Sequence, residues 1–321
     1  MERVSLCGYI LRLVKQPPVL APSLPIETHA HMTPPSTPFA RRMRLHMARF
    51  AAVAAATAAV VTPFAAHAQT DYYNTDLGRP LQVEDYLALE RYGLELQAAP
   101  LRVERGVGGV YSWGVEPELA YGILPRTHLE VGLPFAYVDG GALGGSASGL
   151  AGIDVSLLHQ LNAETAIPGL AVVAEALLPA GGLGPEQAYF SAKGIATRTL
   201  SWARFHANAQ YTFGSTLPAG GEAGSLGAGA VELSRWTAGV AADRTFPLRS
   251  LLVGAELYAR DPLRAGEDVE LASTVGVRYQ QSPRWALDGG IGRRLTGDDQ
   301  GWYATFGTAY AFGLPFLIPT R

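Results

Sequence analysis

The chain has 321 residues, a formal net charge of −3, 48% hydrophobic residues and a single cysteine, Cys7. One cysteine excludes a disulfide framework within the chain. Mean hydropathy is +0.10, and after residue 68 no uncharged apolar stretch reaches the roughly 20 residues of a membrane-spanning helix, which excludes a helical membrane protein.

The first 68 residues have the composition of a secretory leader. Four arginines between residues 41 and 49 precede the apolar run 50–61, and Ala-His-Ala follows at 66–68. This order predicts a signal peptide over 43–68, cleaved after Ala68. Residues 1–42 are rich in proline and lack periodicity, so we interpret them as an over-extended, disordered start. The alternative is a genuine, unusually long n-region, for example of the twin-arginine type.

Removing the leader makes the chain more acidic. It holds seven of the 25 basic and two of the 28 acidic residues, which leaves 18 basic and 26 acidic side chains, a net charge of −8. This balance argues against nucleic acid as a partner, and none is expected. Residues 69–88 are polar and irregular and are assigned to a periplasmic N-terminal tail. The pattern leaves open whether this tail enters the domain that follows.

The rest of the chain alternates apolar and polar residues with a period of two. In the run 128–137, for example, Leu129, Val131 and Leu133 oppose His128 and Glu130. Such alternation over about ten residues indicates a β-strand with two different faces. Twelve runs have this character: 89–99, 112–123, 128–137, 151–161, 169–178, 188–200, 204–213, 234–246, 251–261, 270–281, 285–296 and 302–313.

The connections between these runs alternate in length. Those such as 138–150 and 214–233 are long and rich in glycine, whereas those such as 124–127 and 201–203 are short. Long outer loops alternating with short periplasmic turns are typical of outer-membrane barrels. The sequence therefore predicts an all-β fold: a closed antiparallel transmembrane β-barrel of 12 strands over 89–313, in the outer membrane of a Gram-negative-type bacterium.

The last strand carries a C-terminal pattern of such barrels. Gly307 is followed by Tyr310 and Phe312, two aromatic residues on one face, and we interpret these three residues as an assembly signal. The expected partners are outer-membrane lipid and the barrel-assembly machinery. Closure requires 302–313 to pair with 89–99, and residues 314–321 are left as a short tail.

Aromatic residues also lie near the predicted strand ends. Outer-membrane barrels place such residues in two girdles at the membrane surfaces. The candidates are Tyr92, Trp113, Tyr137, Tyr189, Trp236, Trp285, Trp302 and Phe312.

If the apolar face contacts lipid, the charged residues of the opposite face line the lumen, because charges facing lipid are costly. They form either a network that fills the interior or a polarised channel for solutes. The acidic ones come mainly from the first half of the barrel and the basic ones from the second. The predicted lumen residues are Glu95, Glu116, Glu118, Glu130, Asp154, Glu175, Lys193, Arg204, Arg235, Glu256, Arg260, Arg278, Asp288 and Arg294.

Enzymatic patterns are weak. Ser156 and Asp154 share a face, and His128 can approach them from the neighbouring strand, which permits a hydrolase triad. No nucleophile elbow accompanies them, so we assign no catalytic residue. No spacing indicates a metal site, and no motif indicates a cofactor.

One hairpin, Trp113 to Phe135, contains an E-x-x-Y-G pattern, a short turn and an alternating run that ends in Gly-Leu-Pro. It resembles outer-membrane transporters of the phenol-degradation meta-pathway family. The resemblance implies passage of small, often hydrophobic, compounds and carries over no individual functional residue.

The sequence thus predicts a passive channel for small solutes. An alternative is a non-conducting structural or adhesion barrel acting through its outer loops 138–150 and 214–233, and a less favoured one is the Ser156 hydrolase.

Overall fold

The computed structural model describes residues 80–98, 101–105, 111–139, 146–217, 233–297 and 300–313. Their regular structure consists of strand segments, and no helix among these residues is long and apolar enough to span a membrane. The segments are β1 (Gly93–Gln97), β2 (Leu101–Arg105), β3 (Tyr111–Val115), β4 (Glu118–Leu124), β5 (Thr127–Gly132), β6 (Phe135–Asp139), β7 (Ser146–Leu150), β8 (Ile153–Gln160), β9 (Gly169–Leu178), β10 (Tyr189–Thr199), β11 (Arg204–Phe213), β12 (Ser234–Thr245), β13 (Leu251–Pro262), β14 (Glu270–Ser282), β15 (Trp285–Arg294) and β16 (Trp302–Gly313).

These sixteen segments make twelve strands. β1 and β2 are two halves of one strand, as are β3 and β4, β5 and β6, and β7 and β8, because each half pairs with the matching half of the neighbouring strand. Pro117 and Pro134 lie in two of the interruptions, where proline lacks the N–H that a ladder needs. Gly152 lies in another and has φ +130°. The predicted number of strands is confirmed.

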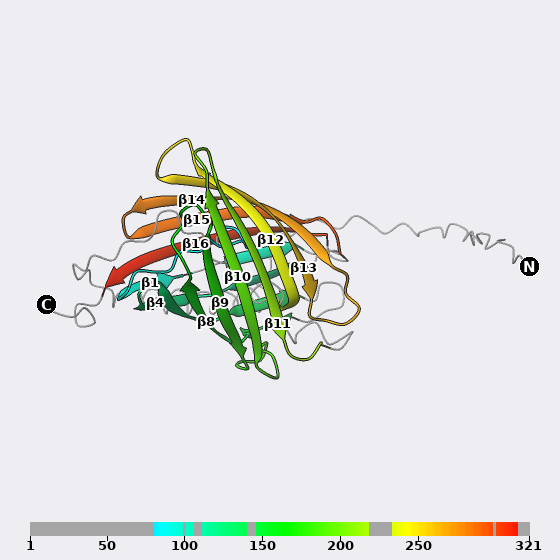
Figure 1. Ribbon diagram of the computed structural model, residues 1–321. Coiled ribbons are helices and arrows are strands. Elements are labelled where there is room, and N and C mark those ends of the chain that lie inside the picture. The colour runs from blue at the N-terminus through cyan, green and yellow to red at the C-terminus, as the bar shows by residue number, and fades with distance from the viewer. Residues whose placement is uncertain are drawn as a thin grey trace, which may run out of the picture. The chain divides into compact units, whose positions relative to one another are not determined.

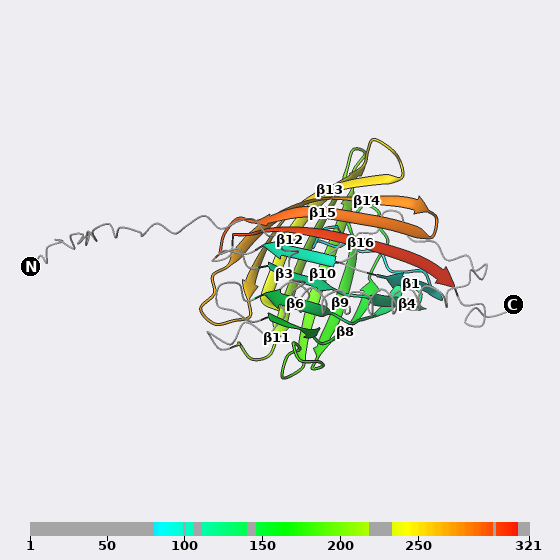
Figure 2. The same cartoon turned by 180° about the vertical axis from the view of Figure 1, so that it is seen from behind.

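The sheet closes on itself. β16 pairs with β15 on one side and with both β1 and β2 on the other, with Leu96 opposite Tyr310 and Leu101 opposite Phe306. Figure 1 shows β14, β15 and β16 side by side, and Figure 2 shows the same wall from behind. The predicted pairing of the last strand with the first is therefore confirmed. Every strand of a closed barrel has two neighbours, which is what a hydrocarbon environment requires.

Strand limits follow the predicted runs closely. β9, β11 and β16 coincide with the predicted ranges 169–178, 204–213 and 302–313. The largest difference is in the first strand, which continues as β2 to Arg105 instead of ending at residue 99. Two buried polar residues, Arg102 and Glu104, therefore come from a segment that was expected to be a loop.

The two faces of the wall differ as the alternation predicts. The outward face carries exposed apolar side chains, such as Val240, Ile291 and Phe306 at 57%, 62% and 59% exposure. Tyr189 departs from the predicted girdle: it is buried, and Gln187 Nε2 donates a hydrogen bond to its hydroxyl at 3.1 Å. Tyr189 has the same parity along β10 as the buried residues Ser191 and Lys193, so it lies on the inward face.

Candidate functional site

Residues 80–89, called the inner segment below, lie inside the barrel. The sequence left open whether the tail enters; in the structure Leu81, Val83 and Asp85 are at most 2% exposed although they belong to no strand. A tight turn joins the inner segment to β1, with Tyr92 at φ 66° and its N–H donating to Gly122 O at 2.7 Å. Residues 69–79 lie outside the described part of the chain.

Glycines in the barrel wall make room for the inner segment. A Cβ at Gly276 on β14 would lie 2.5 Å from Pro80 Cβ, and one at Gly239 on β12 would lie 2.7 Å from Val83 Cγ2. At Gly169 on β9 a Cβ would come within 2.4 Å of the Tyr86 ring. Separations below 3.0 Å are not tolerated, so the inner segment can pack this closely only against glycine. These glycines form a track along the inner wall.

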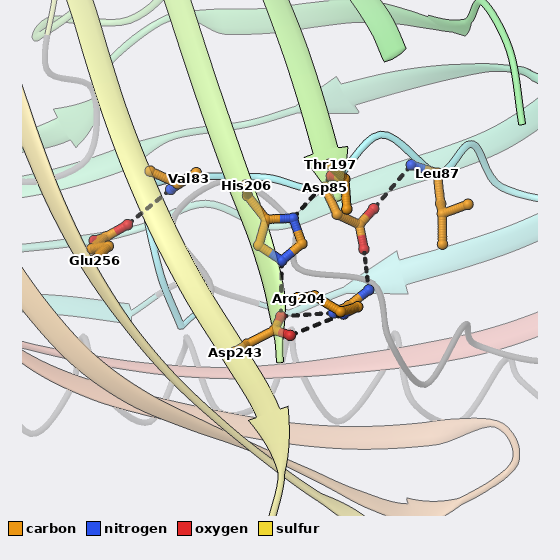
Figure 3. A network of polar contacts seen from close by, with 8 residues as sticks. All are labelled: Val83, Asp85, Leu87, Thr197, Arg204, His206, Asp243 and Glu256. Carbon is orange, nitrogen blue, oxygen red and sulfur yellow. Dashed lines mark hydrogen bonds and ion pairs between the residues drawn. The ribbon is translucent and has the colours of Figure 1, made fainter. Parts of the chain in front are cut away.

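Two acidic residues of the inner segment pair with basic residues of the wall. Glu84 forms an ion pair with Lys193 on β10. Asp85 accepts a hydrogen bond from Arg204 Nη1 at 3.3 Å, and Arg204 also holds Asp243 through Nε and Nη2 at 2.9 and 2.7 Å. Figure 3 shows Asp85 pointing from the inner segment toward Arg204, with Asp243 of β12 beside the same guanidinium. Buried charges of this kind are stable only when paired.

Backbone groups of the inner segment bond to wall side chains. The N–H groups of Gln82 and Val83 both donate to Glu256 Oε2, at 2.7 and 2.9 Å. The N–H of Leu89 donates to His128 Nδ1 at 2.9 Å. Wall side chains thus take the place of a neighbouring strand for these backbone donors.

Small apolar contacts complete the packing. Tyr86 packs against Leu158, Val173 and Ile195, which are buried at 4%, 6% and 2% exposure. Leu81 and Val83 pack against Ala241 on β12. Charged, hydrogen-bonding and apolar contacts therefore all hold the inner segment in one place.

Burial affects the titration of Glu84, which lies outside the strands. Desolvation raises the pKa of the Glu84 carboxyl above its ordinary value, and the Lys193 ammonium opposes this shift without cancelling it. Glu130 and Glu175 raise the pKa further. Protonation of Glu84 is thus easier inside the barrel than in water.

A hydroxyl, an imidazole and a carboxylate are aligned beside Arg204. Thr197 Oγ1 lies 2.9 Å from His206 Nδ1, and His206 Nε2 lies 3.1 Å from Asp243 Oδ2. The order matches that of a hydrolytic triad. However, Thr197 is 1% exposed and His206 2%, so a substrate has no access to the hydroxyl. The group positions Asp243 for Arg204.

The hydrolase considered from the sequence is not assembled. Ser156 Oγ donates to Glu130 Oε2 at 3.0 Å, and His128 Nε2 lies 3.5 Å from the other oxygen of Glu130. Since His128 Nδ1 accepts from Leu89, both ring nitrogens are occupied by groups other than Ser156.

The later strands contribute a chain of ion pairs toward the loop end of the barrel. Arg294 Nη2 donates to Glu104 Oε2 at 2.9 Å, and Glu104 also pairs with Arg102. Arg260 Nε donates to Glu270 Oε2 at 2.6 Å. Arg294 Nε lies 3.6 Å from that same oxygen, which joins the two pairs. Arg102 and Glu104, both on β2, were missed because the first strand was expected to end before Pro100.

The earlier strands supply more acids than bases. Glu175 accepts from Gln210 Nε2 at 3.3 Å, and Glu130 accepts from Ser156. Glu116 lies between β3 and β4 beside Gly132, while Asp154 on β8 is half-buried. Lys193 is the nearby base, so this side of the wall carries more carboxyl groups than bases.

The remaining predicted lumen residues differ in placement. Glu95 on β1 is buried and accepts from Gln97 Nε2 at 3.4 Å, and Glu118 begins β4. Arg278 and Asp288 are buried and stand directly opposite each other on β14 and β15.

Arg235 does not follow the predicted parity. The register of β12 shifts between Ser234 and Trp236, and such a bulge reverses which face a residue occupies. Arg235 accordingly lies over the exposed ring of Tyr211, 5.9 Å from its centroid, and donates to Thr212 O at 2.8 Å. This places Arg235 at the rim of the barrel rather than in the lumen.

The three residues of the expected assembly signal lie on β16. The rings of Tyr310 and Phe312 stack with centroids 6.4 Å apart, and Gly307 stands opposite Asp288. In the described ranges, no group of three His, Cys, Asp or Glu residues is arranged to hold a metal ion.

A closed twelve-stranded antiparallel barrel with a polar interior is the architecture of outer-membrane β-barrels. Comparison with solved structures agrees. A COG4313 outer membrane channel from Pseudomonas putida F1 superimposes with a TM-score of 0.50, at 15% identity over 74% of this chain and 100% of that one. The KdgM porin has 12% identity over 68% of this chain and 99% of that chain, with a TM-score of 0.42. At 15% identity the likeness to the COG4313 channel concerns the fold. No protein-family model and no curated protein matches the sequence.

The glycine track leads to a prediction. Replacing Gly239 with leucine puts a side chain where Val83 lies, so the inner segment should leave the wall, at a cost of about 1–3 kcal/mol in its docking. In folded, detergent-solubilised protein, we expect chymotrypsin to cleave near Tyr86 at least about tenfold faster in this variant than in the wild type.

Gly194→Leu is the matched control, because a Cβ at Gly194 on β10 meets nothing within 4 Å. Equal cleavage rates in the wild type and Gly239→Leu would contradict the role assigned to the track.

Proposed function

We propose that the protein is an outer-membrane channel that passes small solutes passively and is narrowed by its own inner segment. The observation that carries the proposal is the position of the inner segment against β9, β12 and β14 inside the barrel. A barrel that only needs its interior filled can use the side chains of its own wall. A separate segment that narrows the lumen is therefore better explained in a pore.

The size of the barrel supports a pore. Barrels of about eight strands are filled by their own side chains, whereas those of 16–18 strands leave a water-filled channel. Twelve strands lie between these cases. The inner segment and the ion pairs around Arg204 and Arg294 occupy part of the interior, and the proposed path for solutes runs through the part that they leave.

The proposed solutes are small and include apolar compounds. Tyr86 covers an apolar patch of the inner wall formed by Leu158, Val173 and Ile195. If the inner segment moves, this patch faces the lumen beside the acidic side chains of Glu130 and Glu175. A lumen with both apolar and charged surface suits small amphiphilic molecules.

Single-channel recording in planar bilayers tests the proposal. The wild type should show small or rare conductance steps, and Gly239→Leu should show larger or more frequent ones because its inner segment is displaced. Gly194→Leu should behave as the wild type. Absence of conductance from Gly239→Leu that is correctly folded would contradict a channel and would favour a non-conducting structural barrel.

The titration of Glu84 predicts a pH dependence. Its carboxyl has a higher pKa when docked than when released, so docking binds a proton. Docking is therefore most favourable below the ordinary value of 4.5 and weakens as the pH rises above it. We expect the open fraction to be larger at pH 8 than at pH 5.

Glu84→Gln keeps a neutral side chain at every pH and should flatten this dependence. An unchanged pH profile in Glu84→Gln would show that another group controls the opening.

A further inference from the structure

The outer surface of the barrel carries a row of alternating arginine and aromatic side chains. Arg293 on β15 stands directly opposite Trp302 on β16, Trp302 opposite Arg105 on β2, and Arg105 opposite Tyr111 on β3. Four adjacent strands thus place four side chains at one level. All four are exposed and belong to the outward face, with Tyr111 and Trp302 at 49% and 57% exposure.

Each arginine lies over an aromatic ring of the row. The guanidinium carbon of Arg293 is 5.3 Å from the Trp302 ring centroid, and that of Arg105 is 5.7 Å from the Tyr111 centroid. Stacking orients a guanidinium and leaves its N–H edge available for an anion. Within the described residues neither guanidinium has an ion-pair partner.

The row lies at the edge of the apolar band. Two residues farther from the loops, the outward positions are Ile291, at 62% exposure, and Val103, at 38%. On the other side, β2 and β15 end and β3 and β16 begin, which is the loop-bearing end of the barrel. Trp113 and Tyr137 extend the aromatic surface, with their rings stacked at 5.8 Å. The arginines are therefore at the depth where lipid headgroups begin.

We propose that Arg105 and Arg293 bind the phosphate groups of a phosphorylated glycolipid in the outer leaflet. Arginine forms paired, charge-assisted hydrogen bonds with phosphate. The two arginines are two strands apart, about 10 Å between their backbones, so a lipid with more than one phosphate can contact both. The aromatic rings and the apolar band below accept its sugar and acyl chains. This inference rests on the proposed outer-membrane location with the loops facing outward.

Binding of purified lipopolysaccharide to the folded full-length mature protein in detergent tests the proposal. The double variant Arg105→Gln/Arg293→Gln should bind at least about tenfold more weakly than the wild type, since it loses two charge-assisted contacts. Arg244→Gln/Arg249→Gln is the matched control, because these exposed arginines lie at the opposite end of the barrel. Heat-dependent gel migration confirms that each variant is folded.

Two further arms identify the chemical group that is recognised. Dephosphorylated lipopolysaccharide should bind the wild type as weakly as intact lipopolysaccharide binds the double variant, and the double variant should not distinguish the two lipids. Inorganic phosphate should compete poorly, because it lacks the apolar part of the ligand. Full competition by inorganic phosphate would assign the row to a free anion and overturn the proposal.

Equal binding of intact lipopolysaccharide by the wild type and the double variant would also overturn it. Conductance is measured separately and does not involve these outward residues. A barrel that binds the lipid but never conducts would refute the proposed channel and leave the lipid site intact.

Discussion

A membrane-spanning sheet must pair every backbone N–H and C=O group within itself, since hydrocarbon offers no hydrogen-bonding partner. The pairing of β16 with β15, β1 and β2 meets this requirement by closing the sheet. Closure fixes an inside and an outside, and the period of two in each strand then assigns every side chain to one of them. Most charges in the middle of the strands are directed inward as a result, where they need partners, and outward charges such as Arg105 and Arg293 lie near strand ends.

The inner segment supplies part of those partners. Lys193 and Arg204 face carboxylates of Glu84 and Asp85, and Glu256 receives two backbone N–H groups. Each of these interactions is polar, so each can be exchanged for water if the segment leaves. A barrel closed only by apolar packing would lose far more on opening. The balance of contacts therefore suits a constriction that is stable but able to move.

Local sequence patterns predicted the strands because their causes are local. Alternation located β9, β11 and β16 at their observed limits, and the pattern of Gly307, Tyr310 and Phe312 was the reason to expect the barrel to end with the run 302–313. Two predictions about the strands were wrong, namely the end of the first strand and the face of Arg235. The first strand was expected to end at residue 99, although the alternation of Leu101 to Arg105 continues beyond Pro100. A bulge turned Arg235 outward without any signal in its own neighbourhood.

The candidate site was harder to predict because its contacts join distant parts of the chain. Gly239 and Gly276 lie within strands, and the reason for a glycine at each position is the approach of Val83 and Pro80, more than 150 residues earlier. Glu84 and Asp85 lie in a polar stretch without periodicity, and only the fold brings them to Lys193 and Arg204. The wall charges themselves could be named from the alternation; their partners could not.

The position of the inner segment in the membrane-embedded protein is tested most directly by a disulfide. Val83 and Ala241 pack together inside the barrel, and Ala242, the next residue, faces outward. The mature chain is predicted to contain no other cysteine, because Cys7 precedes the expected cleavage site. Under mild oxidation of outer membranes, Val83→Cys/Ala241→Cys should form the disulfide in most molecules and Val83→Cys/Ala242→Cys should not. Failure of the first pair to cross-link in folded protein, or equal cross-linking of both, would contradict an inner segment held inside the barrel.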